Sequence, residues 1–197
     1  MLDIPNLQSV NLSKSFEYVY NPIVNSSFLF YYLSIDVSEL LFPNVYHMDY
    51  VQSIYSCITS IILPNWTCND INYTNFDFSR FTLVESIEIG NHCFGSVQLF
   101  RIDGLNRLKT IKIGNNSFTQ KRNCNGNDKS KSFHILNCES LESIQIGEYS
   151  FSDFAGDFEL KNCPQLQSIQ IGKIQSKSCN FLYSSFVIRG TDMISII

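Results

Sequence analysis

The chain has 197 residues, of which 44% are hydrophobic and only 16% are charged. It is too apolar for a disordered chain, and polar residues interrupt its apolar runs too often for a membrane protein. The formal net charge of -4 offers no basic surface to nucleic acid or anionic lipid. We therefore expect a folded protein that inserts in no membrane and binds no nucleic acid.

The first 57 residues are the least regular part of the chain. Met1 is followed by neither a basic segment nor a continuous apolar run, so no secretory signal is predicted. As written, the chain is expected to be cytoplasmic, and the cell surface is the alternative if it is a fragment of a longer protein. Residues 4–12 and 37–44 are degenerate copies of a repeat that becomes clear from residue 58 onward.

Two short units alternate through residues 58–197. One reads VESIEIG at 84–90, LKTIKIG at 108–114, LESIQIG at 141–147 and LQSIQIG at 166–172. The other starts eight residues earlier as F-x-F, F-x-I or F-x-L, at 76–78, 100–102, 133–135 and 158–160. The first apolar positions of the former unit fall at 58, 84, 108, 141, 166 and 194, which gives periods of 26, 24, 33, 25 and 28 residues.

Alternation of apolar and polar residues within each unit predicts a short strand with one buried face. No segment has a 3.6-residue apolar period of any length, so helix should be scarce. The glycine that ends the first unit is expected to permit a sharp turn, and Phe94, Phe118 and Phe151 should then return to the core. One unit cannot bury its own apolar side, so the repeats predict stacked parallel strands in a single solenoid over residues 1–197.

The string FELKNCPQLQSIQI at 158–171 resembles the leucine-rich repeat, whose kernel is L-x-x-L-x-L-x-x-N/C. It is most similar to the irregular repeats of surface antigens from microbial eukaryotes and some bacteria. Cys138 and Cys163 stand where that family buries an asparagine or cysteine, whereas Phe81 and Leu105 depart from the pattern. The resemblance implies a leucine-rich-repeat-like solenoid, mostly β, that binds a protein across an extended face.

Three features are candidate binding sites, each beside a plainer interpretation. The outward positions of the F-x-L strands form a charged strip that is either the partner face or a solvated face with cross-strand pairs such as Asp77 with Arg101. The outward positions of the I-x-I strands alternate between Glu and Lys from one repeat to the next, a pattern that suggests ion pairs which stabilise the strand register. The insertion at 119–132, rich in Asn, Gly and Lys, is either a functional or a mobile polar loop. The strip comprises Asp77, Arg101, Asp103, His134, Glu159, Lys161 and Arg189, and the second set comprises Glu85, Glu88, Lys109, Lys112, Glu142, Gln145, Gln167 and Gln170.

Motifs for chemistry are sparse. No histidine lies at a spacing that suits zinc, and no nucleophile or phosphate-binding motif occurs, so no cofactor or metal is expected. Cys93 beside His92 is the nearest approach to a catalytic pair, but a buried core thiol is the preferred interpretation. The seven cysteines form no CxxC pair, an odd set that suits reduced thiols.

The hypothesis from the sequence is a non-enzymatic protein-binding scaffold with a protein partner. One alternative is a carbohydrate-active parallel β-helix enzyme that uses Asp77, Asp103 and Glu159. Another is a structural segment of a cell-surface adhesin. The chain starts and ends within repeats, without polar capping units, so we also expect self-association through the C-terminal residues Ile194, Ile196 and Ile197.

Overall fold

The computed structural model describes residues 10–11, 58–120, 126–173, 178–191 and 195–196. These residues form strands and turns and contain no helix. The described residues therefore include no helix that is long and apolar enough to span a membrane. The degenerate copy at 37–44 and most of the first 57 residues lie outside the described part of the chain.

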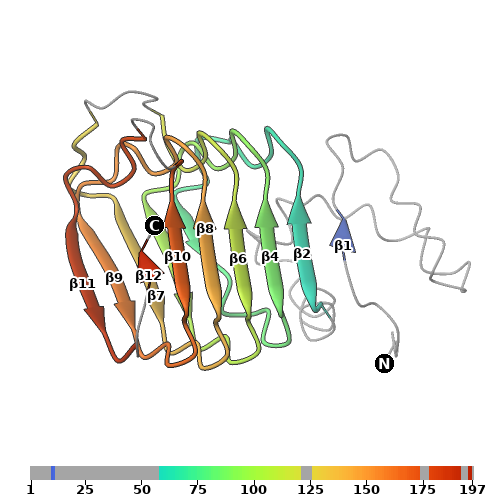
Figure 1. Cartoon of the computed structure of the whole chain (residues 1–197). Coiled ribbons are helices and arrows are strands. Elements are labelled where there is room, and N and C mark those ends of the chain that lie inside the picture. Colours follow the sequence, from blue (N-terminus) through green and yellow to red (C-terminus); the bar gives the residue numbers. More distant parts are fainter. Residues whose placement is uncertain (1–9, 12–57, 121–125, 174–177, 192–194, 197) are drawn as a thin grey trace, which may run out of the picture.

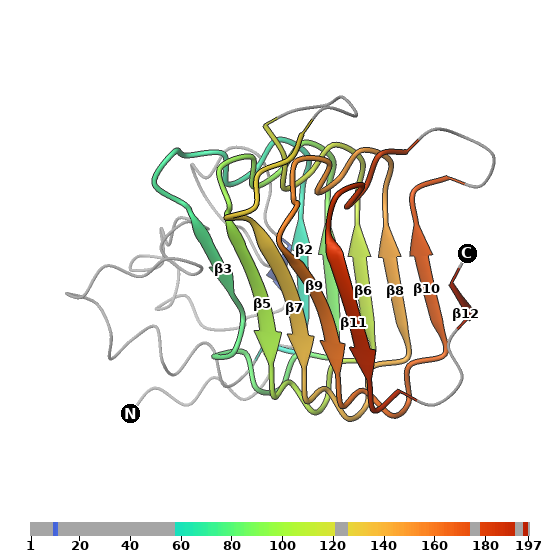
Figure 2. The same ribbon diagram turned by 90° about the vertical axis from the view of Figure 1, so that its left-hand side faces the viewer.

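The chain winds into a solenoid of about five coils with two parallel sheets, one on each side (Figures 1 and 2). Sheet A holds the strands of the I-x-I units, and sheet B holds those of the F-x-L units. The order in sheet A is β1 (Val10–Asn11), β2 (Ser60–Leu63), β4 (Ser86–Ile89), β6 (Thr110–Ile113), β8 (Ser143–Ile146), β10 (Ser168–Ile171) and β12 (Ser195–Ile196). The order in sheet B is β3 (Asn75–Asp77), β5 (Leu99–Asp103), β7 (Ser132–Leu136), β9 (Asp157–Lys161) and β11 (Ser185–Arg189).

The register of the strands confirms the predicted repeat. Equivalent isoleucines pair from coil to coil, and Val10 of the degenerate first copy pairs with Ile61 as the alignment of the repeats requires. Ile171 is only partly buried, and the described residues of β12 pair with β10 at Ser168 and Ile169. The central row contains Val10, Ile61, Ile87, Ile111, Ile144, Ile169 and Ile196.

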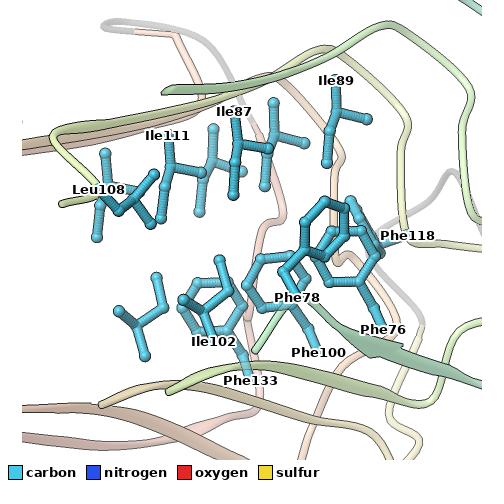
Figure 3. Packing of buried hydrophobic residues seen from close by; sticks show 14 of the residues in the cluster. Phe76, Phe78, Ile87, Ile89, Phe100, Ile102, Leu108, Ile111, Phe118 and Phe133 are labelled. Atoms are coloured by element: carbon cyan, nitrogen blue, oxygen red, sulfur yellow. The ribbon is translucent and has the colours of Figure 1, made fainter. Parts of the chain in front are cut away.

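Phenylalanine side chains fill the interior in two ladders. Figure 3 shows Phe76, Phe100 and Phe133 of one ladder and Phe118 of the other. The ladder from sheet B has ring centroids 4.6 to 4.8 Å apart and comprises Phe76, Phe100, Phe133, Phe158 and Phe186. The ladder from the turns after sheet A has spacings of 4.7 to 4.9 Å and comprises Phe94, Phe118, Phe151 and Phe181. Rings of the two ladders meet edge to face, as Phe100 and Phe118 do at 87°, which is a favourable arrangement of aromatic quadrupoles. The predicted return of Phe94, Phe118 and Phe151 to the core is confirmed.

Among the glycines that end the I-x-I units, only Gly172 has the left-handed backbone of a sharp glycine turn (φ 74°). Gly147 has no left-handed backbone. It is needed because a Cβ there would lie 2.5 Å from the carbonyl carbon of Gly114 in the preceding coil. The left-handed positions come two and four residues later, at Tyr149 (φ 60°) and Phe151 (φ 57°). Such a backbone is unfavourable for a bulky residue, and the stacked position of Phe151 in the core offsets that cost.

Asparagine side chains connect neighbouring coils in the turns that follow the strands of sheet A and in the turns that follow the strands of sheet B. After sheet A, Asn65 Oδ1 accepts from the N–H of Asn91 at 2.7 Å, and Asn91 Oδ1 accepts from the N–H of Asn115 at 2.7 Å. After sheet B, Asn162 Nδ2 donates to Asn137 Oδ1 at 2.8 Å. Both asparagine ladders satisfy backbone or amide groups that would otherwise depend on water.

A buried ion pair attaches the insertion to the solenoid. Lys131 Nζ lies 2.8 Å from Asp153 Oδ2, and the two side chains are 5% and 4% exposed. The ammonium also lies 5.6 Å from the ring centroid of Phe154, and the N–H of Asp128 donates to the carbonyl of Asp153. Residues 126–132 of the insertion therefore pack on the turn that precedes β9.

Candidate functional site

The outer face of sheet B carries all seven residues of the predicted strip. On β3, β5, β7 and β9 these positions alternate with buried residues, and on β11 Arg189 lies opposite Lys161 in the strand register. The strip therefore lies on one surface of sheet B, the sheet whose strands are seen together in Figure 2. The strand register arranges this surface in two lines. The first line contains Asp77, Arg101, His134, Glu159 and Val187, and the second contains Asp103, Leu136, Lys161 and Arg189.

Ion pairs hold most of these charges in fixed positions. Arg101 lies opposite Asp77 on the neighbouring strand, as expected, but Arg101 Nη2 lies 2.6 Å from Asp103 Oδ2 on its own strand, and among the described residues no ion pair joins Arg101 to Asp77. Asp77 instead accepts from the N–H of Ser79 at 2.9 Å. The arginine side chain is long enough to contact a carboxylate on its own strand or on the next strand. Asp103 is fixed in position because its Oδ1 accepts a hydrogen bond from Asn137 Nδ2 at 2.8 Å.

Glu159 is the centre of the best-connected group on this face. Its carboxylate pairs with Lys161 on the same strand and with His134 Nδ1 at 3.0 Å on the neighbouring strand. Hydrogen bonds from Lys161 and then from His134 hold the pKa of Glu159 below its ordinary value of 4.5. The carboxylate therefore stays ionised near neutral pH and is poorly suited to the role of a general acid.

Apolar residues on the outer face were missed by the sequence analysis. Leu99, Leu136 and Val187 point outward at strand positions and are partly exposed. Their position in the alternating pattern was available from the sequence, but only charged residues were considered. The face is therefore mixed, with fixed charges beside aliphatic side chains.

The outer face of sheet A is arranged differently. Lys109 pairs with Glu85 at 2.8 Å, and Lys112 pairs with Glu88 at 2.9 Å, in both cases between adjacent coils. Mutual hydrogen bonding lowers the pKa of Glu85 and raises that of Lys109. These contacts agree with the interpretation that this face supports register. Glu142, Gln145, Gln167 and Gln170 continue the same surface.

Cys93 and His92 do not form a nucleophile and base. The Cys93 thiol is fully buried and donates to the carbonyl of Pro64 at 3.1 Å, and burial raises its pKa. The His92 ring stacks on Trp66 with centroids 3.9 Å apart. Among the described residues no group of three metal-ligating side chains occurs.

Cysteines occupy equivalent core positions in two neighbouring coils. Cys138 and Cys163 are fully buried free thiols, and a hydrogen bond between them together with burial raises the pKa of Cys138. Cys68 and Cys93 are also free, but Cys179 is disulfide-bonded, so the prediction of reduced thiols is wrong for that residue. The stacking of coils brings Cys138 and Cys163 into contact although they are far apart in the sequence, and short cysteine motifs such as CxxC cannot predict such a contact.

Comparison with models of known protein families, with curated proteins and with solved structures finds no match for this chain.

Proposed function

We propose that the protein is a non-enzymatic scaffold that binds a protein partner across the outer face of sheet B. The observation that carries the proposal is the fixed arrangement of charges on that face. Ion pairs and the strand register hold Arg101, Glu159 and Lys161 in place. A partner then loses little side-chain entropy on binding, which favours specific recognition. The aliphatic residues Leu99 and Leu136 add apolar contact area.

The resemblance to leucine-rich repeats belongs to this proposal. It accords with the parallel coils and with the buried cysteines at equivalent turns. The enzyme alternative is less well supported, because Asp103 and Glu159 are engaged in ion pairs and Asp77 in a local turn.

Charge reversal on matched faces tests the proposal. Arg101→Glu with Lys161→Glu should remove the partners that co-purify with the wild-type protein, while Lys109→Glu with Lys112→Glu should retain them. Exposed ion pairs contribute about 1 kcal/mol or less, so all variants should unfold at similar urea concentrations. Quantitative mass spectrometry of co-purified proteins provides the readout. Equal loss from both faces, or no loss from either, would reject sheet B as the partner face.

The second candidate is a segment of a cell-surface adhesin, and one observation favours it. Cys179 is disulfide-bonded, and disulfides persist mainly in oxidising compartments. The cytoplasmic alternative requires Cys179 to be reduced in the native protein. Mass spectrometry of the protein alkylated in its native host, without reductant, distinguishes the two locations.

A further inference from the structure

Within the described part of the chain, sheet B ends one strand before sheet A at the C-terminal end of the solenoid. Strand β12 pairs with β10 and begins a further coil on the side of sheet A. Strand β11 is the last strand of sheet B and pairs with β9 alone (Figure 2). The described residues therefore place no strand beside β11 on the coil that β12 begins. An edge of this kind offers backbone N–H and C=O groups to an added strand.

The aromatic ladder of sheet B is open at the same place. Its interior rings, Phe133 and Phe158, are 0% and 1% exposed, whereas Phe186 on β11 is 53% exposed. Phe186 stacks on Phe158 with ring centroids 4.6 Å apart, and the ladder has no further ring on its other side among the described residues. At the opposite end of the ladder, Phe76 is 1% exposed. The ladder can therefore accept another ring at β11.

We propose that this edge binds an extended segment of a partner protein, which adds to sheet B as a strand parallel to β11. The segment carries a phenylalanine opposite Phe186, an isoleucine or leucine opposite Ile188, and an aspartate or glutamate opposite Arg189. Its first two residues continue the buried rows in which Phe186 follows Phe158 and Ile188 follows Leu160. In strand addition the backbone hydrogen bonds supply affinity, and alternate side chains supply specificity.

Charge complementarity selects the acidic residue of the segment. Arg189 lies opposite Lys161 in the strand register, and like charges opposite each other are unfavourable. Lys161 pairs with Glu159, whereas Arg189 has no ion pair among the described residues. Register partners of opposite charge do pair between parallel strands of this protein, as Glu88 and Lys112 do at 2.9 Å. A carboxylate opposite Arg189 would have the same geometry.

The ladder favours the parallel direction. A parallel segment in register places its phenylalanine on Phe186, at the spacing of 4.6 to 4.8 Å that the other rings keep. An antiparallel segment centred on Val187 would place its phenylalanine on Ile188 and its acidic residue opposite Ser185, away from Arg189.

A single strand fits where a second copy of the solenoid does not. Strand β12 extends sheet A beyond the coil that carries β11, so it occupies the place that the terminal coil of a second copy would need. An added strand in sheet B leaves β12 in its position. The self-association expected at Ile194, Ile196 and Ile197 stays a prediction, since Ile194 and Ile197 lie outside the described residues.

Fluorescence anisotropy with short labelled peptides tests the site. The probe GDFELEN has the sequence of residues 156–162 with glutamate in place of Lys161, and the unchanged sequence GDFELKN is its control. We expect the wild-type protein to bind the probe and to bind GDFELKN about fivefold or more weakly, because its lysine faces Arg189. The peptide GDSELEN lacks the ring that supplies most of the apolar contact, so it should show no binding at concentrations of the probe that saturate the protein. Only the peptides change, so misfolding of the protein cannot cause these differences.

A charge swap on the protein tests the register. Arg189→Glu should reverse the preference and bind GDFELKN more tightly than GDFELEN, because the lysine of the peptide then faces a carboxylate. Arg101→Glu is the matched control, since this arginine lies on the same face but has strand neighbours on both sides, and both affinities should be unchanged. Urea unfolding checks that both variants remain folded.

Three outcomes would overturn the proposal: no binding of GDFELEN, equal affinities of the wild-type protein for the two charged peptides, or an unchanged preference in Arg189→Glu. An oligomer in light scattering that binds no probe would show that a second copy covers the edge instead. Arg101→Glu alters the proposed partner face and not this edge, so its effect on peptide binding separates the two proposals.

Discussion

Replacement of Lys131 with methionine tests how strongly the buried ion pair holds the insertion on the solenoid. The ammonium lies 2.8 Å from Asp153 Oδ2, in a site where both side chains are about 95% buried. Without it, the carboxylate keeps one donor among the described residues, the N–H of Gln120 at 3.2 Å, because Oδ1 has no hydrogen-bond partner there. A buried charge that loses its partner costs about 3 to 5 kcal/mol, and we expect this loss in the free energy of unfolding at neutral pH.

Urea unfolding with linear extrapolation measures the loss, and a double variant is the control. Lys131→Met with Asp153→Asn removes both charges and keeps an acceptor for Gln120, so most of the stability should return. A loss below about 1 kcal/mol, or a double variant as unstable as the sum of the single changes, would refute the reasoning.

Two further predictions concern the core and the strip. Ile144 is 1% exposed, so Ile144→Ala should cost about 2 to 5 kcal/mol; less than about 1 kcal/mol in chemical denaturation would contradict the register. The pKa of Glu159 is lowered in the folded state, so its contribution to stability is present above pH 4.5 and is lost as the pH falls through the lowered value. In the Glu159→Gln variant the free energy of unfolding should fall less steeply with decreasing pH in this range. The same slope in the variant and the wild-type protein would contradict the ion pairs of Glu159.

The strands and their register were predictable because every coil uses the same residues in the same places. Once one I-x-I-G unit is recognised, its neighbours are aligned, and Ile111 pairs with Ile144 as expected. The same reasoning placed the seven charged residues on one face. Periodicity determines which residues share a row because the side chains of a strand alternate between its two faces.

Other features have no periodic signal. The partner of Arg101 depends on how a long side chain turns, not on its row. Lys131 and Asp153 are 22 residues apart, and Lys131 belongs to an insertion without a counterpart in the other coils. Left-handed phenylalanines contradict the local preference of the residue, because stacking in the core outweighs the backbone cost at Phe118 (φ 55°).

The hydrogen bonds of both sheets and both asparagine ladders run from coil to coil, along the axis of the solenoid. A force that pulls the two ends of the solenoid apart therefore loads these bonds one row at a time. The terminal coil can peel away while the remaining coils keep their own contacts. Under tension the chain should lengthen in steps of one coil, each releasing about 24 to 33 residues.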